Sequence, residues 1–284
     1  MGGVASQLDA GWSGWHADPS ILLGLAFLCC WYAWSARRLD RRGEGPRRRQ
    51  RLWLVVAVVA MLVALTGPLH DLSDNYLFTA HMTQHLLLML VFPPALLLSL
   101  APGMLRPLLR PRWVGAAARF VTRPVIAFGL CNAVFAVSHL PPFYDLTLRN
   151  HDLHVVEHLL FIATATLLWW PLLSPLPELP SMSYGAQLLY LFLQVLPGSL
   201  IGGLIANSER ALYPFYAAAP RVSPLSAVQD QQLGAIVMWV GGGTFFLIAF
   251  SVVFFRWAAQ DMAESRAQAR PPSVRAGPPG GRGT

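Results

Sequence analysis

Two pairs of histidines share a four-residue spacing that could bring metal ligands together. His81 and His85 form the first pair, and His154 and His158 form the second. Residues four apart lie on one face of an α-helix, about 6 Å apart along its axis. Neutral imidazole binds copper, zinc and iron, so each pair could supply two ligands from one helix. We predict a metal site that combines both pairs with His139.

Five further side chains are weaker candidates for the same site. The thioether of Met89 lies one turn beyond His85 and would favour copper(I). Glu157 could orient a neighbouring histidine or pair with an arginine such as Arg149. Asp230 opens the last apolar segment, where it could instead cap the start of a helix. The other two weaker candidates are His70 and His151.

Two other kinds of metal chemistry find little support in the sequence. Residues 154–158 read H-V-V-E-H, which matches an inverted zinc-protease pattern. That pattern needs a third ligand and a substrate cleft, and the sequence indicates neither. The three cysteines, Cys29, Cys30 and Cys131, form no C-x-x-C pair. We therefore predict neither a protease nor a thiolate metal site.

The composition is that of a chain that lies mostly in a membrane. It is 55% hydrophobic and 12% charged, whereas soluble domains carry roughly 25% charged residues. A spanning helix needs about 20 mostly apolar residues. We predict an all-α, polytopic transmembrane bundle with seven spans. The predicted spans are Pro19–Ala36, Leu52–Leu69, His81–Leu100, Pro124–Leu140, His154–Leu173, Tyr184–Ala206 and Gln231–Phe255.

The arginines predict how these spans are oriented. Eighteen of the 21 basic residues fall on one side of the predicted arrangement, and that side should be cytoplasmic. The N-terminus is then outside and the C-terminus cytoplasmic, and all eight histidines fall on the outer side. Because the arginines lie beside apolar segments, they indicate topology and not a nucleic-acid surface. We expect the paired histidines at the water-facing ends of spans, where replacing them would cost little packing.

Three regions divide the chain. Residues 1–18 form an external segment that includes His16, which we expect to take no part in the site. Residues 19–256 form the transmembrane domain. Residues 257–284 are rich in Pro, Gly and Arg, and we expect a disordered cytoplasmic tail.

Several motifs, in this order, resemble the CtaG-type cytochrome c oxidase assembly factors. The first is H-M-T-Q-H-L-L-L-M-L at residues 81–90, followed by Pro93 and Pro94. The second runs from His139 through the second histidine pair to W-W-P-L at residues 169–172. The third is D-Q-Q at residues 230–232, leading to Met238 and Trp239. The resemblance covers about residues 53–255, most of the chain.

This resemblance implies a multi-pass protein of the bacterial inner membrane that helps to assemble a haem-copper terminal oxidase. It implies maturation of the oxidase, through copper supply, and no catalysis. The expected partners are oxidase subunits, an external copper chaperone and membrane lipid, without nucleic acid. Two alternatives stay open at this point: a haem-binding membrane protein, and a scaffold for oxidase subunits that binds no metal.

Overall fold

The structure is a computed structural model, and it describes residues 19–268. These residues form helices and no strand, which confirms the all-α prediction for the described part of the chain. His16 lies outside the described residues. The long helices are α2 (Pro19–Asp40), α3 (Arg48–Leu65), α9 (Pro124–Ser138), α11 (His151–Leu173), α12 (Tyr184–Ala206) and α15 (Gly242–Gln268). Three shorter helices that continue into a neighbour are α5 (Phe78–Leu86), α6 (Phe92–Ser99) and α14 (Ala227–Ile236).

Two of the continuous helical segments contain a π-helical turn. The turn η1 (Leu87–Val91) joins α5 to α6, and η3 (Val237–Gly241) joins α14 to α15. Such turns are frequent at functional sites because the extra residue changes which side chains share a face. Here η1 begins two residues after His85. Side chains beyond the first histidine pair therefore lie on a different face from the one that regular α-helical spacing would give them.

Five helical segments are long and apolar enough to cross a membrane. They are Pro19–Asp40, Phe78–Ser99, His151–Leu173, Tyr184–Ala206 and Ala227–Gln268. The pair formed by α8 (Arg112–Val121) and α9 would make a sixth span, with a bend of 73° between the two helices. The helix α3 covers the remaining predicted span, but it begins with Arg48, Arg49 and Arg51. Large apolar side chains such as Leu23 and Phe255 are 71% and 70% exposed, as expected for surfaces that face lipid.

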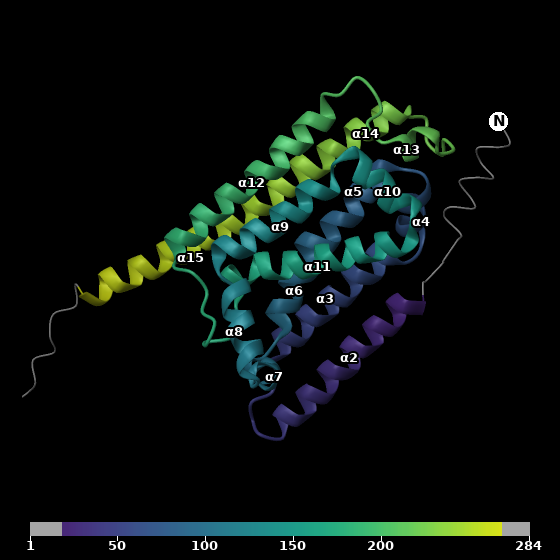
Figure 1. The fold of residues 1–284 in the computed structure, drawn as a ribbon. Helices are drawn as coiled ribbons and strands as arrows, with labels where there is room; N and C mark the ends of the chain where they lie inside the picture. The colour runs from purple at the N-terminus through teal and green to yellow at the C-terminus, as the bar shows by residue number, and fades with distance from the viewer. Residues whose placement is uncertain (1–18, 269–284) are drawn as a thin grey trace, which may run out of the picture.

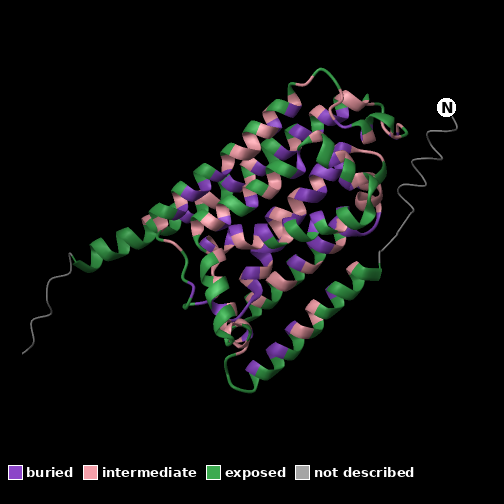
Figure 2. Cartoon of the chain, viewed as in Figure 1, coloured by how far each residue is buried: buried purple, intermediate pink, exposed green. Residues whose placement is uncertain are grey.

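The long helices lie side by side in a bundle, with α2 along one edge and the end of α15 projecting beyond it (Figure 1). Buried residues gather in the middle helices, while α2 and the projecting part of α15 are largely exposed (Figure 2). The helix α15 continues to Gln268, so residues 257–268 are helical instead of belonging to a disordered tail. Residues 269–284 of that predicted tail lie outside the described part.

Short helices cover one end of the bundle (Figure 1). They are α4 (Pro68–Asn75), α10 (Pro141–Arg149) and α13 (Pro214–Ala218). The helix α3 ends at Leu65, and Gly67 turns the chain with a φ of 71°, a conformation that suits glycine. His70 therefore lies on α4, which begins within the last residues of the predicted span Leu52–Leu69.

A glycine lets α14 approach α5 closely at this covered end. A Cβ atom at Gly234 would lie 2.4 Å from the ring of Phe78, so only glycine fits without a shift. One turn earlier, the carboxylate of Asp230 accepts hydrogen bonds from the backbone N–H groups of Phe78 (2.8 Å) and Thr79 (3.2 Å). The first turn of α5 is thus fixed in place by α14.

Candidate metal centre

Four histidines meet in the interior of the covered end of the bundle. His81 and His85 project from α5, and His154 and His158 project from α11. Their exposed fractions are 1%, 5%, 5% and 7%. The expectation that these histidines lie at water-facing ends of spans is wrong, because α4, α10 and α13 fold over them.

The imidazole rings lie close enough to bind one ion together. The Nε2 atoms of His81 and His85 are 2.8 Å apart. The ring centroid of His158 is 5.7 Å from that of His85 and 6.4 Å from that of His81. One nitrogen from each of these three rings lies within 4.8 Å of the other two, as one metal ion requires. The histidine pair on α5 therefore faces the pair on α11.

A hydrogen-bond chain fixes the proton of His81. The phenol of Tyr216 on α13 donates to the backbone carbonyl of Ser73, and burial raises its pKa well above the ordinary value. Its oxygen lies 2.9 Å from Nδ1 of His81. Since the phenol proton points to Ser73, Nδ1 of His81 must carry a hydrogen and donate it to the phenol oxygen. The Nε2 atom of His81 is then a lone pair, the form that binds metal.

A second group of ligands lies beside the first. The Nε2 atom of His154 is 3.5 Å from Oδ1 of Asp74, and its Nδ1 atom is 3.3 Å from Oε2 of Glu157. One ligand atom each from Asp74, His81 and His154 lies within 4.8 Å of the other two. Burial acts to raise the pKa of the Asp74 carboxyl. The hydrogen bond with His154 and the charge interactions with nearby histidines lower this pKa by more than burial raises it. The pKa of Asp74 is held well below its usual range, so the group is a carboxylate.

Several buried nitrogens of the cluster have no hydrogen-bond partner among the described residues. They include Nδ1 of His85 and Nε2 of His139 and His158. A buried polar atom without a partner costs about 1–3 kcal/mol, so the protein retains these atoms at a cost in stability. Unpaired imidazole nitrogens are what a metal ion would bind, and the residues present fit a metal with nitrogen ligands.

Two cavities flank the histidine cluster. One, of about 390 Å³, is lined by His70, Asp74, His151, His154 and His158 together with apolar side chains of α2, α3 and α11. The other, of about 60 Å³, is lined by residues that include His85, His139, Met82, Met89 and Cys131. His81 lines neither cavity. The five histidines that we predict to form one site therefore do not line one shared cavity.

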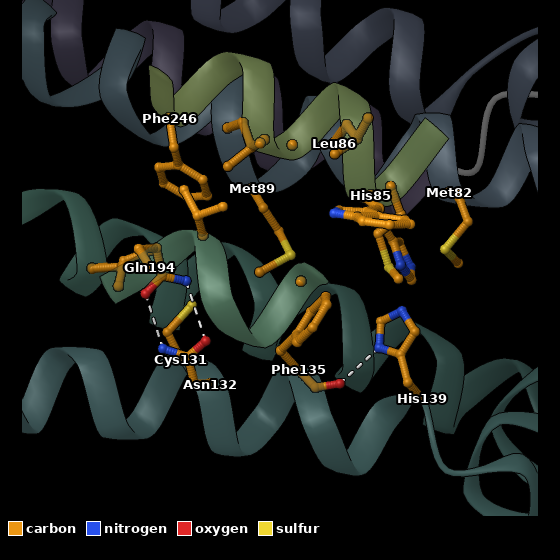
Figure 3. Close-up of a pocket in the computed structure, with 18 residues that line it drawn as sticks. Met82, His85, Leu86, Met89, Cys131, Asn132, Phe135, His139, Gln194 and Phe246 are labelled. Carbon is orange, nitrogen blue, oxygen red and sulfur yellow. Dashed lines mark hydrogen bonds between the residues drawn. The ribbon is translucent and has the colours of Figure 1, made fainter. Parts of the chain in front are cut away.

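The second cavity brings sulfur beside imidazole. Met89 and His85 point toward Phe135 and His139 on the opposite wall (Figure 3). The Nδ1 atom of His139 lies 2.7 Å from the carbonyl of Phe135, and its ring centroid is 6.5 Å from that of His85. Met89 therefore belongs to the His85–His139 side of the cluster, away from Asp74.

The weaker candidates occupy different places. His70 lies 3.4 Å from Asp74 and 3.2 Å from the amide of Gln84, behind the carboxylate. Glu157 contacts His154, in agreement with the expectation that it orients a neighbouring histidine. It does not pair with Arg149, which instead pairs with Asp145 at 2.6 Å. The three remaining weaker candidates are His151 at the larger cavity, Met89 at the smaller one, and Asp230 as the cap of α5.

Sequence reasoning missed two important residues of the centre, Asp74 and Tyr216. Both lie on short helices outside the predicted spans, where no spacing relates them to the histidines. Asp230 does cap a helix, but it caps α5, while Ser226 caps its own helix α14. Only the folded chain reveals these contacts.

The chain matches a known protein family. The model of the cytochrome c oxidase caa3 assembly factor family (Caa3_CtaG) matches residues 30–260, most of the chain. The chain belongs to this family. No curated protein and no solved structure matches the chain. The match to the caa3 assembly factor family includes both histidine pairs, Asp74, Tyr216 and Asp230.

Proposed function

We propose that this caa3 assembly factor binds copper transiently through its buried histidines and supplies it to a haem-copper oxidase during assembly. The observation that carries the proposal is the group formed by His81, His85 and His158, whose ligand atoms lie within 4.8 Å of one another. Imidazole suits copper in both oxidation states, and the nearby Met89 favours copper(I). Copper here is cargo, and the protein does not act as an enzyme.

The proposal includes a place and an orientation. The protein lies in the bacterial cytoplasmic membrane with seven spans, its N-terminus outside and its C-terminus cytoplasmic. The support is the positive-inside distribution of arginine together with the apolar helices. The histidine cluster then lies at the outer end, where an external copper chaperone and the oxidase subunits would meet it.

The haem alternative fits this geometry less well. Two axial histidines must approach a haem from opposite faces, with the macrocycle between them. His81 and His85 lie on one helix, so a haem would need one of them and one histidine of α11. The rings of His81 and His85 are already packed against Tyr144 and Phe161, with centroids 5.3 Å and 4.6 Å apart, which leaves little space for a macrocycle. The zinc-protease alternative also loses support, because His154 and His158 belong to different ligand groups.

The experiment that tests the proposal replaces His81 and His85 with glutamine. We expect copper content and activity of the oxidase to fall about tenfold or more, since the remaining ligands cannot hold the ion. Because both histidines are buried, abundance of the protein is measured in the same membranes. The matched control is Gln187→Ala, which removes a buried polar side chain that donates to the carbonyl of Met182.

Three outcomes separate the competing functions. Partial restoration of oxidase activity by external copper at about millimolar concentration supports copper supply, through mass action. A scaffold without metal predicts that activity falls only in proportion to loss of the protein. A Soret band in the purified protein that disappears in the double variant would establish haem binding instead.

A further inference from the structure

We propose that the cluster offers a metal ion two overlapping positions that share His81, and that the ion passes from one to the other by ligand exchange. The inference rests on the proposed copper function and adds a route for the ion. The entry position consists of Asp74, His154 and His81, and the inner position consists of His81, His85 and His158.

The entry position is already spaced for a metal ion. Metal bonds to imidazole nitrogen and carboxylate oxygen measure about 2.0–2.2 Å, so two ligands at a tetrahedral angle lie about 3.4 Å apart. The Nε2 atom of His154 and Oδ1 of Asp74 are 3.5 Å apart. An ion could lie between them with little movement of either side chain, and the half-buried carboxylate would attract it.

The inner position is closed until an ion enters it. The Nε2 atoms of His81 and His85 are 2.8 Å apart, a hydrogen-bond distance. Ligands on one tetrahedral ion must separate to about 3.3 Å, so the two rings have to move apart by about half an ångström. His158 completes this position with an Nε2 atom that has no hydrogen-bond partner among the described residues.

The two positions cannot be filled at once. The contact with Tyr216 leaves Nδ1 of His81 protonated, so His81 has only its Nε2 lone pair to offer. A lone pair binds one ion. The ion therefore keeps its bond to His81 while it exchanges Asp74 and His154 for His85 and His158.

The ligands give this exchange a direction. Asp74 and His154 line the larger cavity, as does His158 of the inner position, whereas His85 lines the smaller one together with Met82 and Met89. The ring of His81 is close to both sides, with centroid distances of 5.4 Å to His154 and 4.2 Å to His85. The ligands change from one carboxylate and two imidazoles to three imidazoles, with the thioethers of Met82 and Met89 beside His85, and this change favours copper(I).

The exchange breaks and forms metal–ligand bonds and moves one proton. Since Nε2 of His81 is a lone pair, Nε2 of His85 carries the hydrogen between them, and this proton moves to Nδ1 of His85, which has no partner among the described residues, before Nε2 binds the ion. The exchange needs no oxidant or reductant.

The first test uses copper(II) bound to the purified full-length protein, with electron paramagnetic resonance to count the coordinated nitrogens. We expect one copper per wild-type chain. The variant His85→Gln/His158→Gln should still bind one copper, with two nitrogens and an affinity lower by about 10–100-fold. Asp74→Asn/His154→Gln should keep the three-nitrogen signal. Adding His85→Gln and His158→Gln to that variant should abolish binding.

The outcomes separate this inference from the proposed function. If the wild type binds copper but His85→Gln/His158→Gln binds none, the inner position stands alone and the two-position route is wrong. If the wild type binds no copper, the copper function itself fails. Two coppers bound per wild-type chain would also overturn the route, since His81 could not then be shared.

A milder variant tests the route without removing a histidine. Asp74→Asn keeps the shape of the side chain and should leave the three-nitrogen signal unchanged. Loading from solution should slow by about tenfold or more, because a charged entrance raises association rates by that order. The matched control is Asp71→Asn on the same helix, whose carboxylate accepts only from Asn75 among the described side chains. Equal loading rates in both variants would exclude Asp74 from the entry position.

Discussion

The phenol oxygen of Tyr216 lies 2.9 Å from Nδ1 of His81, although 135 residues separate the two in the chain. This contact decides which nitrogen of His81 is available. Because the phenol of Tyr216 on α13 also donates to Ser73 on α4, it connects both of these helices to His81 on α5. Metal sites commonly use such partners to fix the tautomer and the ring orientation of a histidine.

The variant Tyr216→Phe tests this positioning function. It keeps the aromatic ring but leaves Nδ1 of His81 without its partner. We expect copper affinity to fall by about 10–100-fold, measured by competition with a chromophoric chelator. The matched control is Tyr190→Phe, which removes a buried phenol that donates to the carbonyl of Leu168. Equal losses of affinity in the two variants would show that Tyr216 has no special function.

Two glycine variants should change stability in opposite directions. A Cβ atom at Gly234 would meet the ring of Phe78 and the backbone of Thr79, so Gly234→Ala should cost about 1–3 kcal/mol. A Cβ atom at Gly203 would contact nothing within 4 Å. Gly203→Ala should therefore stabilise its helix by about 0.5–1 kcal/mol. The free energy of unfolding in mixed micelles measures both, and a tolerated Gly234→Ala would contradict the close packing of α14 on α5.

The cap on α5 gives a third prediction. Asp230→Ala removes the acceptor for two backbone N–H groups, which should lower the free energy of unfolding by about 1–3 kcal/mol. Asp261→Ala, an exposed residue on α15, should change it little. If the two variants unfold alike, the carboxylate is not what holds the start of α5.

Reporter fusions test the proposed orientation. A reporter at Glu44 or after Gln268 should behave as cytoplasmic, and one at Glu209 as external, because arginine-rich connections stay inside. Glu44 and Glu209 are exposed residues in connections between helices, so insertion there should disturb little packing. A cytoplasmic reporter at Glu209 would reverse the orientation and move the histidine cluster to the other side of the membrane.

The sequence allowed most of the long helices and the two histidine pairs to be predicted, because both depend on local properties of the chain. The length of an apolar segment decides whether a helix can cross a membrane, and the helix Tyr184–Ala206 has the predicted bounds. A spacing of four residues decides that two histidines share a helix face, whatever surrounds them. Both properties are local, so they can be read without knowing the fold.

The remaining features depend on contacts between distant segments. The burial of His81 follows from helices α4 and α13, which no apolar periodicity marks as covers for the bundle. Asp74 becomes a ligand candidate only because α4 turns back after Gly67 and packs near α11. Two cavities, instead of one, flank the histidines where α11 packs against η1 and α6, and that packing has no local signal.

The cap on α5 also has a consequence for biosynthesis. The carboxylate that holds Phe78 comes from 152 residues later in the chain, and the phenol that holds His81 from 135 residues later. During translation, the third helix therefore enters the membrane long before the groups that complete its first turn exist. The histidines acquire their final arrangement only when the last helix arrives. A truncated or incompletely inserted chain would lack the finished site, so copper could be captured only by a protein whose synthesis is complete.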